Sequence, residues 1–338
     1  MSAALPSFHE ILGLLPDLPG PDEAAAAAAR ARQAELTKPA GALGRLEELV
    51  AWLAAWQGRH PPRIERPRVA VFAGNHGVVR QGVSLYPAEV TAQMVRNFIS
   101  GGAAINQLCR LADADLRVYE MALEEPTADF TQAPALDEAE CARAVAYGMM
   151  AVEPGLDLLA LGEMGIGNTT SAAALCLLLH GGAAEDWVGD GAGASAQSKA
   201  RKLQAVAAGA ERHRAFAAAP LRALAAVGGR ELAAILGAIL AARLARTPVL
   251  LDGYVVTAAA SVLHKLQPHL LDHCLAAHVS AEPGHRRLLS MLGMRPLLDL
   301  GMRLGEASGA ALAIPVLKSA LACHDGMATF AEAGVSRG

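Results

Sequence analysis

Two glycine-rich segments and one glutamate have residue types and spacing that suggest chemistry. The first segment, Gly-Glu-Met-Gly-Ile-Gly at 162–167, is followed by Asn-Thr-Thr-Ser at 168–171. An apolar run at 156–161 precedes it and an Ala-rich run at 172–179 follows it, so we expect a buried strand, a glycine loop and a helix capped by residues 168–171. Free backbone N–H groups and the helix dipole favour a phosphate at such a junction. A plain strand-to-helix turn is the alternative.

The second glycine segment covers residues 188–193, and we expect it to follow another strand end. A helix expected at 195–208 comes next and carries Lys199, Arg201 and Lys202. A cation within reach of two glycine loops suits a phosphate. Charges on a solvated helix face are the alternative.

Glu306 lies between glycines, just before an apolar helix expected at 310–321. A glutamate there either caps the helix or, where burial raises its pKa, acts as a general base. Two other polar residues follow expected strands. Asp252, after a strand at 248–251, either holds a ribose hydroxyl or caps the next turn, and His76, after a strand at 69–73, either binds a ligand or is satisfied by loop hydrogen bonds.

Several site classes do not fit the spacing. The order Gly-x-x-Gly-x-Gly differs from the dinucleotide fingerprint, which makes NAD the weaker interpretation, and no P-loop sequence is present. His269 and His273 are expected on one helix face and could hold a metal, but no acidic third ligand has motif spacing. We therefore predict neither a metal nor a cofactor.

Composition excludes other classes. The net charge of −4 and an aromatic fraction of 4% argue against a nucleic-acid partner. The apolar stretch at 232–242 is too short to span a bilayer and predicts a buried helix. The N-terminus lacks the basic region of a signal peptide, and the 5 cysteines are scattered as expected for reduced thiols, so we expect a cytoplasmic protein.

The remaining pattern predicts the elements that carry these residues. Helices are expected at 22–36, at 45–57, at 86–98, near 105–109 and at 232–244, and further strands at 116–121 and 278–281. Residues 124–146 are expected to form a loop and a helix on the surface, and Lys38 and Arg45 to be solvated surface charges. His60-Pro61-Pro62 predicts a boundary before the first α/β unit.

Seven blocks, in order along nearly the whole chain, resemble the nicotinate-nucleotide–dimethylbenzimidazole phosphoribosyltransferase family. They are TKPAGALGRLEEL at 37–49, AGNHGV at 73–78, the segment from Tyr86-Pro87 to Met94, GEMGIGNTTSAAA at 162–174, LLDGY at 250–254, SAEPGH at 280–285 and RLGEASGAALA at 303–313. Asn75 stands where that family commonly has Asp, and Ala307 replaces the glycine usual after the catalytic glutamate.

The resemblance implies a role for each matching residue. Glu306 falls on the family's catalytic glutamate, which takes a proton from the benzimidazole. The implied substrate-binding residues are Glu163, Gly165, Gly167, Asn168 and Thr169 in the phosphoribosyl loop, Gly189, Gly191 and Lys202 on the second phosphate-side segment, Ser280 beside the ribose, and Tyr86, Met94 and Leu304 around the base. Asp252 is added as the candidate for a ribose hydroxyl.

The resemblance also implies an activity and a fold. The ribose 5-phosphate of nicotinate mononucleotide would move to 5,6-dimethylbenzimidazole or a related base, with inversion at C1′, in cobalamin biosynthesis. We expect an α/β fold with a Rossmann-like, mainly parallel sheet at 61–300, a small helical lobe from 1–60 plus 301–338, and a homodimer. An NAD-dependent oxidoreductase and a non-catalytic binder of benzimidazoles or nucleotides are the alternatives.

Overall fold

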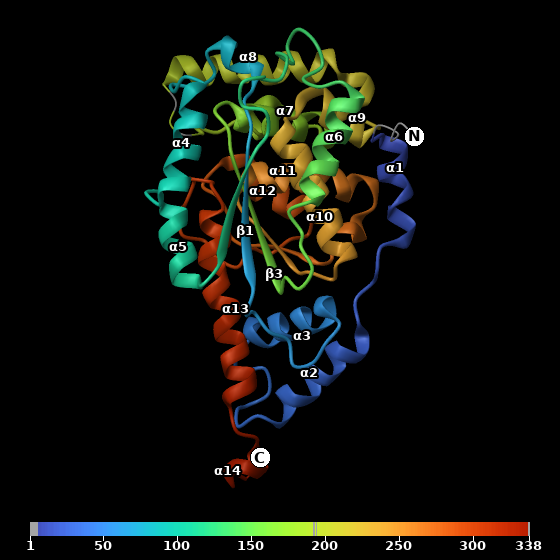
Figure 1. Ribbon diagram of the computed structural model, residues 1–338, viewed down its shortest axis with the longest axis vertical. Helices are drawn as coiled ribbons and strands as arrows, with labels where there is room; N and C mark the ends of the chain where they lie inside the picture. Colours follow the sequence, from blue (N-terminus) through green and yellow to red (C-terminus); the bar gives the residue numbers. More distant parts are fainter. Residues whose placement is uncertain (1–5, 192, 194, 337–338) are drawn as a thin grey trace.

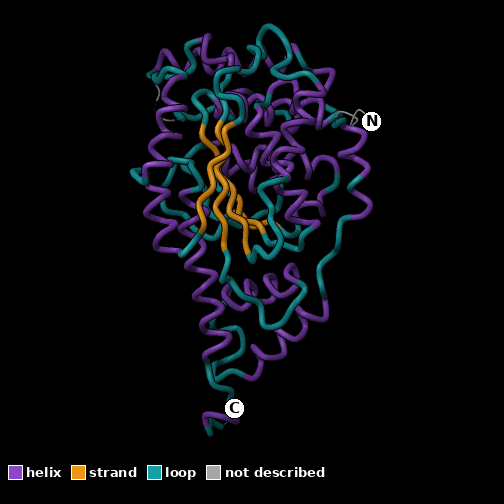
Figure 2. The backbone as a smooth tube through the Cα atoms, viewed as in Figure 1, coloured by secondary structure: helices purple, strands orange, loops and turns teal. Residues whose placement is uncertain are grey.

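A parallel sheet of 5 strands, in the order β2-β1-β3-β4-β5, forms the centre of the chain in the computed structural model (Figure 2). The structure describes residues 6–191, 193 and 195–336. The strands are β1 (Pro67–Ala73), β2 (Asp115–Glu120), β3 (Leu158–Met164), β4 (Val249–Leu251) and β5 (Cys274–Ala276). All neighbouring strands pair in parallel, which confirms the predicted α/β fold class.

Helices cover both faces of the sheet (Figure 1). They are α1 (Phe8–Gly13), α2 (Glu23–Glu35), α3 (Arg45–Gln57), α4 (Glu89–Ser100), α5 (Ala104–Ala112), α6 (Glu138–Met149), α7 (Asn168–His180), α8 (Ala196–Arg212), α9 (Pro220–Val227), α10 (Arg230–Leu244), α11 (Tyr254–Leu266), α12 (Pro283–Met291), α13 (Ser308–Gly326) and α14 (Phe330–Ala333). Side chains of β3 alternate between the two layers. Leu159 and Leu161 pack with α6, α7, α10 and α11, whereas Leu158 and Ala160 pack with α3, α4, α5 and α13.

The connections on either side of β1 create a crevice at one edge of the sheet. The chain passes from β1 to β2 through α4 and α5 on one face, and from β2 to β3 through α6 on the other. Because β2 and β3 flank β1, the chain changes direction there, and ligands of open α/β sheets bind outside the carboxyl ends of strands at such a point.

The terminal helices lie in two places. Helices α2 and α3 pack together, and α3 packs on α13, so that these helices extend beyond the amino-terminal edge of the sheet (Figure 1). Helix α1 instead packs on α6 in the layer that covers the sheet, through the buried Phe8 and Ile11. The division into 61–300 and a lobe of 1–60 plus 301–338 stays a prediction.

Three predicted elements are wrong. The strand expected at 278–281 lies earlier, at β5, and His278 makes only an isolated bridge to Leu298. A short 3-10 turn at Ala184–Asp186, and no strand, precedes the second glycine segment, in which Ala192 lies outside the described residues. His269 and His273 do not share a helix face, because the 3-10 turn Pro268–Leu271 ends between them.

Three charged or helical segments are also less exposed than expected. Helix α6 is no surface helix, since Cys141 and Val145 are fully buried under α10. The Lys38 side chain is 6% exposed and its Nζ lies 2.7 Å from Glu47. Arg45 donates hydrogen bonds to the carbonyl groups of Arg295 and Pro296. Both side chains therefore have protein partners.

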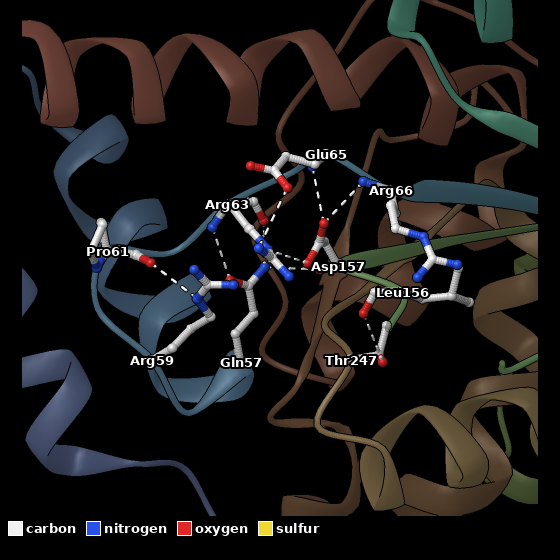
Figure 3. Close-up of polar contacts among 9 residues, drawn as sticks. All are labelled: Gln57, Arg59, Pro61, Arg63, Glu65, Arg66, Leu156, Asp157 and Thr247. Atoms are coloured by element: carbon white, nitrogen blue, oxygen red, sulfur yellow. Dashed lines mark hydrogen bonds and ion pairs between the residues drawn. The ribbon is translucent and has the colours of Figure 1, made fainter. Parts of the chain in front are cut away.

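At the amino-terminal edge of the sheet, Asp157 joins β3 to the chain entering β1 (Figure 3). Its carboxylate accepts hydrogen bonds from Arg63 Nε at 3.1 Å and from the backbone N–H groups of Glu65 and Arg66 at 3.0 and 2.9 Å. Gln57 of α3 donates to the Asp157 carbonyl at 2.9 Å. This network fixes the edge of the sheet that lies away from the crevice.

Candidate active site

A cavity of about 700 Å³ lies at the carboxyl edge of the sheet, within the size range of small-molecule sites. Its walls come from the loops after β1, β3, β4 and β5, from α4 and α8, and from the segment before α13. The predicted site residues in its lining are Tyr86, Met94, Glu163, Gly165, Gly167, Asn168, Thr169, Gly191, Lys202, Ser280, Leu304 and Glu306. Gly189 and Asp252 are not in the lining.

The loop after β3 differs from its prediction in two details. The strand continues through Glu163 to Met164, and Asn168 already belongs to α7. Gly167 is the N-cap, at a φ of 93° that favours glycine, so the expected side-chain capping by 168–171 is wrong. Thr91 of α4 holds the loop, because its Oγ1 accepts a hydrogen bond from Ile166 N at 3.1 Å. The start of α7 therefore faces the cavity.

Glu163 is a buried carboxyl group in this wall. Its Oε2 accepts a hydrogen bond from the Asn168 side chain. Burial and the nearby Asp252 charge raise its pKa to about 8, and the bond from Asn168 only partly opposes them. Glu163 therefore holds a proton at neutral pH.

Glu306 lies directly before α13 in a left-handed backbone conformation, with φ of 60°, and Ala307 follows at 63°. The N-cap is Ala307, and among the described residues the first turn of α13 is held by the Asp252 side chain and not by Glu306, so the capping alternative is wrong. Close approach to β3 requires glycine at position 162, because a Cβ there would lie 2.2 Å from Ala307 N. Burial, and next the Asp252 charge, raise the pKa of Glu306 to about 7, which suits a general base near neutral pH.

Lys202 of α8 joins the two glycine segments. Its Nζ donates hydrogen bonds to Thr169 Oγ1 at 2.8 Å and to the Gly189 carbonyl at 3.2 Å. Gly189 thus holds the lysine from behind the cavity wall. Burial lowers the pKa of Lys202, while the charge of Glu282 opposes this change. The arrangement places a desolvated amine beside the first turn of α7, where an anion is favoured.

Two further predictions concern buried polar residues behind the cavity. Asp252 accepts a hydrogen bond from Ala310 N of α13 at 3.0 Å and lies behind the cavity lining, and its predicted contact with a ribose hydroxyl stays a prediction. His76 is held by hydrogen bonds, with Nε2 at 2.5 Å from Glu231 Oε1 and Nδ1 at 3.0 Å from Ser171 Oγ. Its partners come from α10 and α7, so this histidine ties the loop after β1 to the first turn of α7.

The sequence interpretation missed several lining residues. Glu282 Oε1 accepts a hydrogen bond from Gly191 N at 2.7 Å, and Arg303 Nη1 donates to the Gly191 carbonyl at 2.8 Å. Both residues stand within the SAEPGH and RLGEASG blocks, so block membership was the available signal. The other missed residues are Val83, Ser84, Val90, Met164, Ile166, Asp190, Gly193, Gly253, Tyr254, Val255, His278 and Gly305.

A cavity at the carboxyl edge of a parallel sheet, with a glycine-rich helix start, a buried lysine and a carboxyl group, is typical of α/β proteins that bind a phosphorylated ligand. A family model described as phosphoribosyltransferase (DBI_PRT) matches residues 18–335. The chain belongs to this phosphoribosyltransferase family.

Individual relatives agree with this assignment. The nicotinate-nucleotide–dimethylbenzimidazole phosphoribosyltransferase of Sinorhizobium medicae is 58% identical over 336 residues, which cover 99% of each chain. The enzyme of that name from Brucella anthropi is 56% identical over 336 residues, again covering 99% of each chain. A crystal structure of CobT from Thermus thermophilus has a TM-score of 0.87 and 47% identity, covering 93% of this chain and 99% of that one.

Proposed function

We propose that this chain transfers the ribose 5-phosphate of nicotinate mononucleotide to 5,6-dimethylbenzimidazole or a related base. The products are nicotinate and α-ribazole 5′-phosphate, for cobalamin biosynthesis. The names of the full-length relatives support this reaction. The observation that carries it is a shared cavity, in which Glu306, with a pKa of about 7, lies in one wall and the Lys202 amine with the start of α7 in another.

The chain's own residues suit each requirement of the reaction. The first turn of α7 and Lys202 would bind the 5′-phosphate, and this remote binding energy aligns the ribose. The leaving nitrogen is already a pyridinium, so its departure needs no general acid. Attack by the base nitrogen on the opposite face of C1′ gives inversion, and Glu306 accepts the proton on the other ring nitrogen. General-base help of this kind is worth about 10²–10⁴-fold.

Apolar side chains form the remaining wall, where a flat heterocycle fits. Val90 and Met94 project from α4, and Tyr86 and Leu304 stand at the rim, 48% and 55% exposed. Ring stacking and burial of apolar surface favour a benzimidazole over a sugar in this part of the cavity.

We further infer a homodimer acting in the cytoplasm, on analogy with the family. Among the described residues, no helix combines the length and apolar character that crossing a bilayer requires. Sedimentation equilibrium of the purified chain tests the dimer, since a mass of one chain at micromolar concentration contradicts it.

The decisive experiment incubates the protein with nicotinate mononucleotide and a panel of bases, and detects α-ribotides and nicotinate by mass. We expect Glu306→Gln to lower kcat by about 100-fold or more, with the KM values largely kept. Glu211→Gln, at an exposed helix position, is the matched control and keeps normal turnover. Near-normal turnover of Glu306→Gln removes the general-base role.

The same assay separates the alternatives. A protein that binds both ligands but releases no nicotinate is a non-catalytic binder. Tight NAD binding in equilibrium dialysis, without transferase activity, supports the oxidoreductase.

A further inference from the structure

Asp252, at the carboxyl end of β4, is fully buried behind the cavity wall. Its Oδ1 accepts a hydrogen bond from Ala310 N in the first turn of α13, 58 residues further along the chain. Its Oδ2 has no hydrogen-bond partner among the described residues. The carboxylate therefore fixes the start of the helix that directly follows Glu306, and keeps one oxygen uncommitted.

His278 faces the same carboxylate from the other side. Its Nε2 lies 3.3 Å from Asp252 Oδ1, and the ring is 1% exposed yet lines the cavity. Helix α13 touches this ring directly, because a Cβ at Gly309 would lie 2.0 Å from His278 Cδ2. Burial lowers the pKa of His278, but Asp252 outweighs it and raises the value overall. The raised pKa favours the protonated ring, in which His278 is the counter-charge to Asp252.

We propose that Asp252 and His278 form a positioning pair for Glu306. Asp252 holds the first turn of α13, and so the backbone that presents Glu306 to the cavity, and its negative charge is felt by the Glu306 carboxyl group. His278 sets how much of that charge is left unbalanced. The catalytic meaning of the pair rests on the proposed function, whereas its effect on Glu306 in the free protein does not.

Within the described part of the chain, three further ionisable groups besides Glu306 lie around the pair: Glu163, His285 and Asp299. Glu163 of β3 faces both Asp252 and Glu306, and it is protonated at neutral pH because its pKa is raised to about 8. His285 of α12 accepts from Ser280 N through Nδ1 at 2.8 Å, and burial lowers its pKa to about 3, so it is neutral. Asp299 acts on His278 from the surface, where it pairs with Arg286. Asp252 is therefore the charge that acts directly on Glu306, and His278 is the group that faces Asp252.

The charge effect is tested by carbon NMR on protein labelled at the glutamate carboxyl carbons. The signal lost in Glu306→Gln assigns the resonance, and its titration is followed in the free protein. Asp252→Asn keeps the size of the side chain and its acceptor for Ala310 but removes the charge, so we expect the midpoint to fall by roughly one pH unit. His278→Asn removes the counter-charge, so we expect a rise. Glu211→Gln, at an exposed position of α8, is the surface control and leaves the midpoint in place.

The anchoring effect is tested by kinetics on a second pair of variants. Asp252→Ala loses the acceptor for Ala310, whereas Asp252→Asn retains it. We expect kcat of Asp252→Ala to be about 10-fold below that of Asp252→Asn, with KM for nicotinate mononucleotide within about twofold, because a misplaced base affects the transition state.

Each outcome decides one proposal. Glu306 midpoints that stay unchanged in both Asp252→Asn and His278→Asn overturn the positioning pair, even in an active enzyme. Opposite shifts of those midpoints support the pair. Wild-type protein that makes no α-ribotide overturns the proposed function, and the titration still tests the pair.

Discussion

The two ends of β3 treat a buried carboxylate in opposite ways. Asp157, just before the strand, is 6% exposed and accepts hydrogen bonds from one arginine side chain and two backbone N–H groups (Figure 3). Glu163, near the other end, is 9% exposed and accepts one bond from Asn168 in the described part of the chain. Asp157 and Glu163 are therefore buried to nearly the same extent but differ in the number of hydrogen-bond donors that contact them.

The number of hydrogen-bond donors distinguishes a buried carboxylate that stabilises the fold from one that can exchange a proton. A buried carboxylate with several donors fixes its neighbours through hydrogen bonds. Where donors are scarce and other carboxylates lie near, the proton is held instead, as the raised pKa values of Glu163 and Glu306 show. Such perturbed groups in a cleft mark candidate functional sites. The carboxyl edge of the sheet is thus poised to exchange protons, and the amino edge is fixed.

The largest effect is expected from replacing Asp157, which lies at the donor-rich amino end of β3. Asp157→Ala removes the acceptor for the part-buried backbone N–H groups of residues 65 and 66 and for Arg63, so we expect the free energy of unfolding to fall by about 2–4 kcal/mol. Urea unfolding measures the loss, and kcat of the folded variant should stay near normal. Glu65→Ala, at a side chain 68% exposed, is the control and should change stability by about 0.5 kcal/mol at most. Equal losses in both variants would contradict the role of Asp157.

The next effect concerns the cation at the cavity end. Lys202→Met should raise KM for nicotinate mononucleotide by about 10–100-fold, because a charge-assisted contact to the phosphate is lost while apolar volume is kept. Lys199→Met, one turn earlier on α8 and 44% exposed, is the matched control and should change KM by less than about threefold. Steady-state kinetics decides, and an unchanged KM in Lys202→Met removes this lysine from the phosphate site.

Sequence alone could predict the residues whose signal is local. The run before Gly162 indicates a buried strand, and the Ala-rich run after Ser171 indicates a helix, so the strand-to-helix junction followed without coordinates, and its binding of a phosphate stays a prediction. Glu306 is singled out by the glycines and the apolar helix around it, and its catalytic role, implied by the resemblance, stays a prediction. The α/β class followed in the same way.

Contacts between distant residues could not be predicted. For Asp252 the sequence offered a ribose hydroxyl or the next turn, and nothing near it in the chain indicates Ala310 as its partner. The strand expected at 188 is absent for a related reason: the residues there are held by a lysine and a glutamate from other segments, without a strand ladder. Strand β5 was misplaced because three residues give little periodicity.

A smaller effect is expected at Glu163, which has few hydrogen-bond donors among the described residues and lies near the carboxyl end of β3. The folded pKa of Glu163, about 8, exceeds its ordinary value of 4.5, so the unfolded chain releases this proton first. The resulting stability cost is absent below about pH 4.5, grows as the pH rises towards 8 and is constant above it. Glu163→Gln removes this cost, and we expect it to stabilise the fold by roughly 2 kcal/mol at pH 9 and by less at pH 5. Asp157→Asn, the matching amide at the other end of β3, should destabilise at both pH values. Thermal unfolding of the two variants measures their change in stability relative to the wild type. If both variants are stabilised, or both destabilised, the two ends of β3 do not differ as inferred.

The smallest effect concerns His273, a buried histidine whose protonation affects stability at acid pH. His273 is buried, its Nε2 lies 3.0 Å from the Ile239 carbonyl, and burial lowers its pKa to about 3. Because the unfolded chain binds this proton below about pH 6.5, stability falls as the pH drops from 6.5 towards 3, by about 1 kcal/mol per group at pH 5.5. His273→Gln should flatten the dependence of unfolding free energy on pH in this range, whereas His9→Gln, at an exposed position, should leave it unchanged. If the pH dependence of the unfolding free energy is the same in His273→Gln and in the wild type, His273 can be protonated in the folded protein. The protonation of this buried histidine would then not depend on its hydrogen-bond partners in the way inferred for the carboxylates of β3.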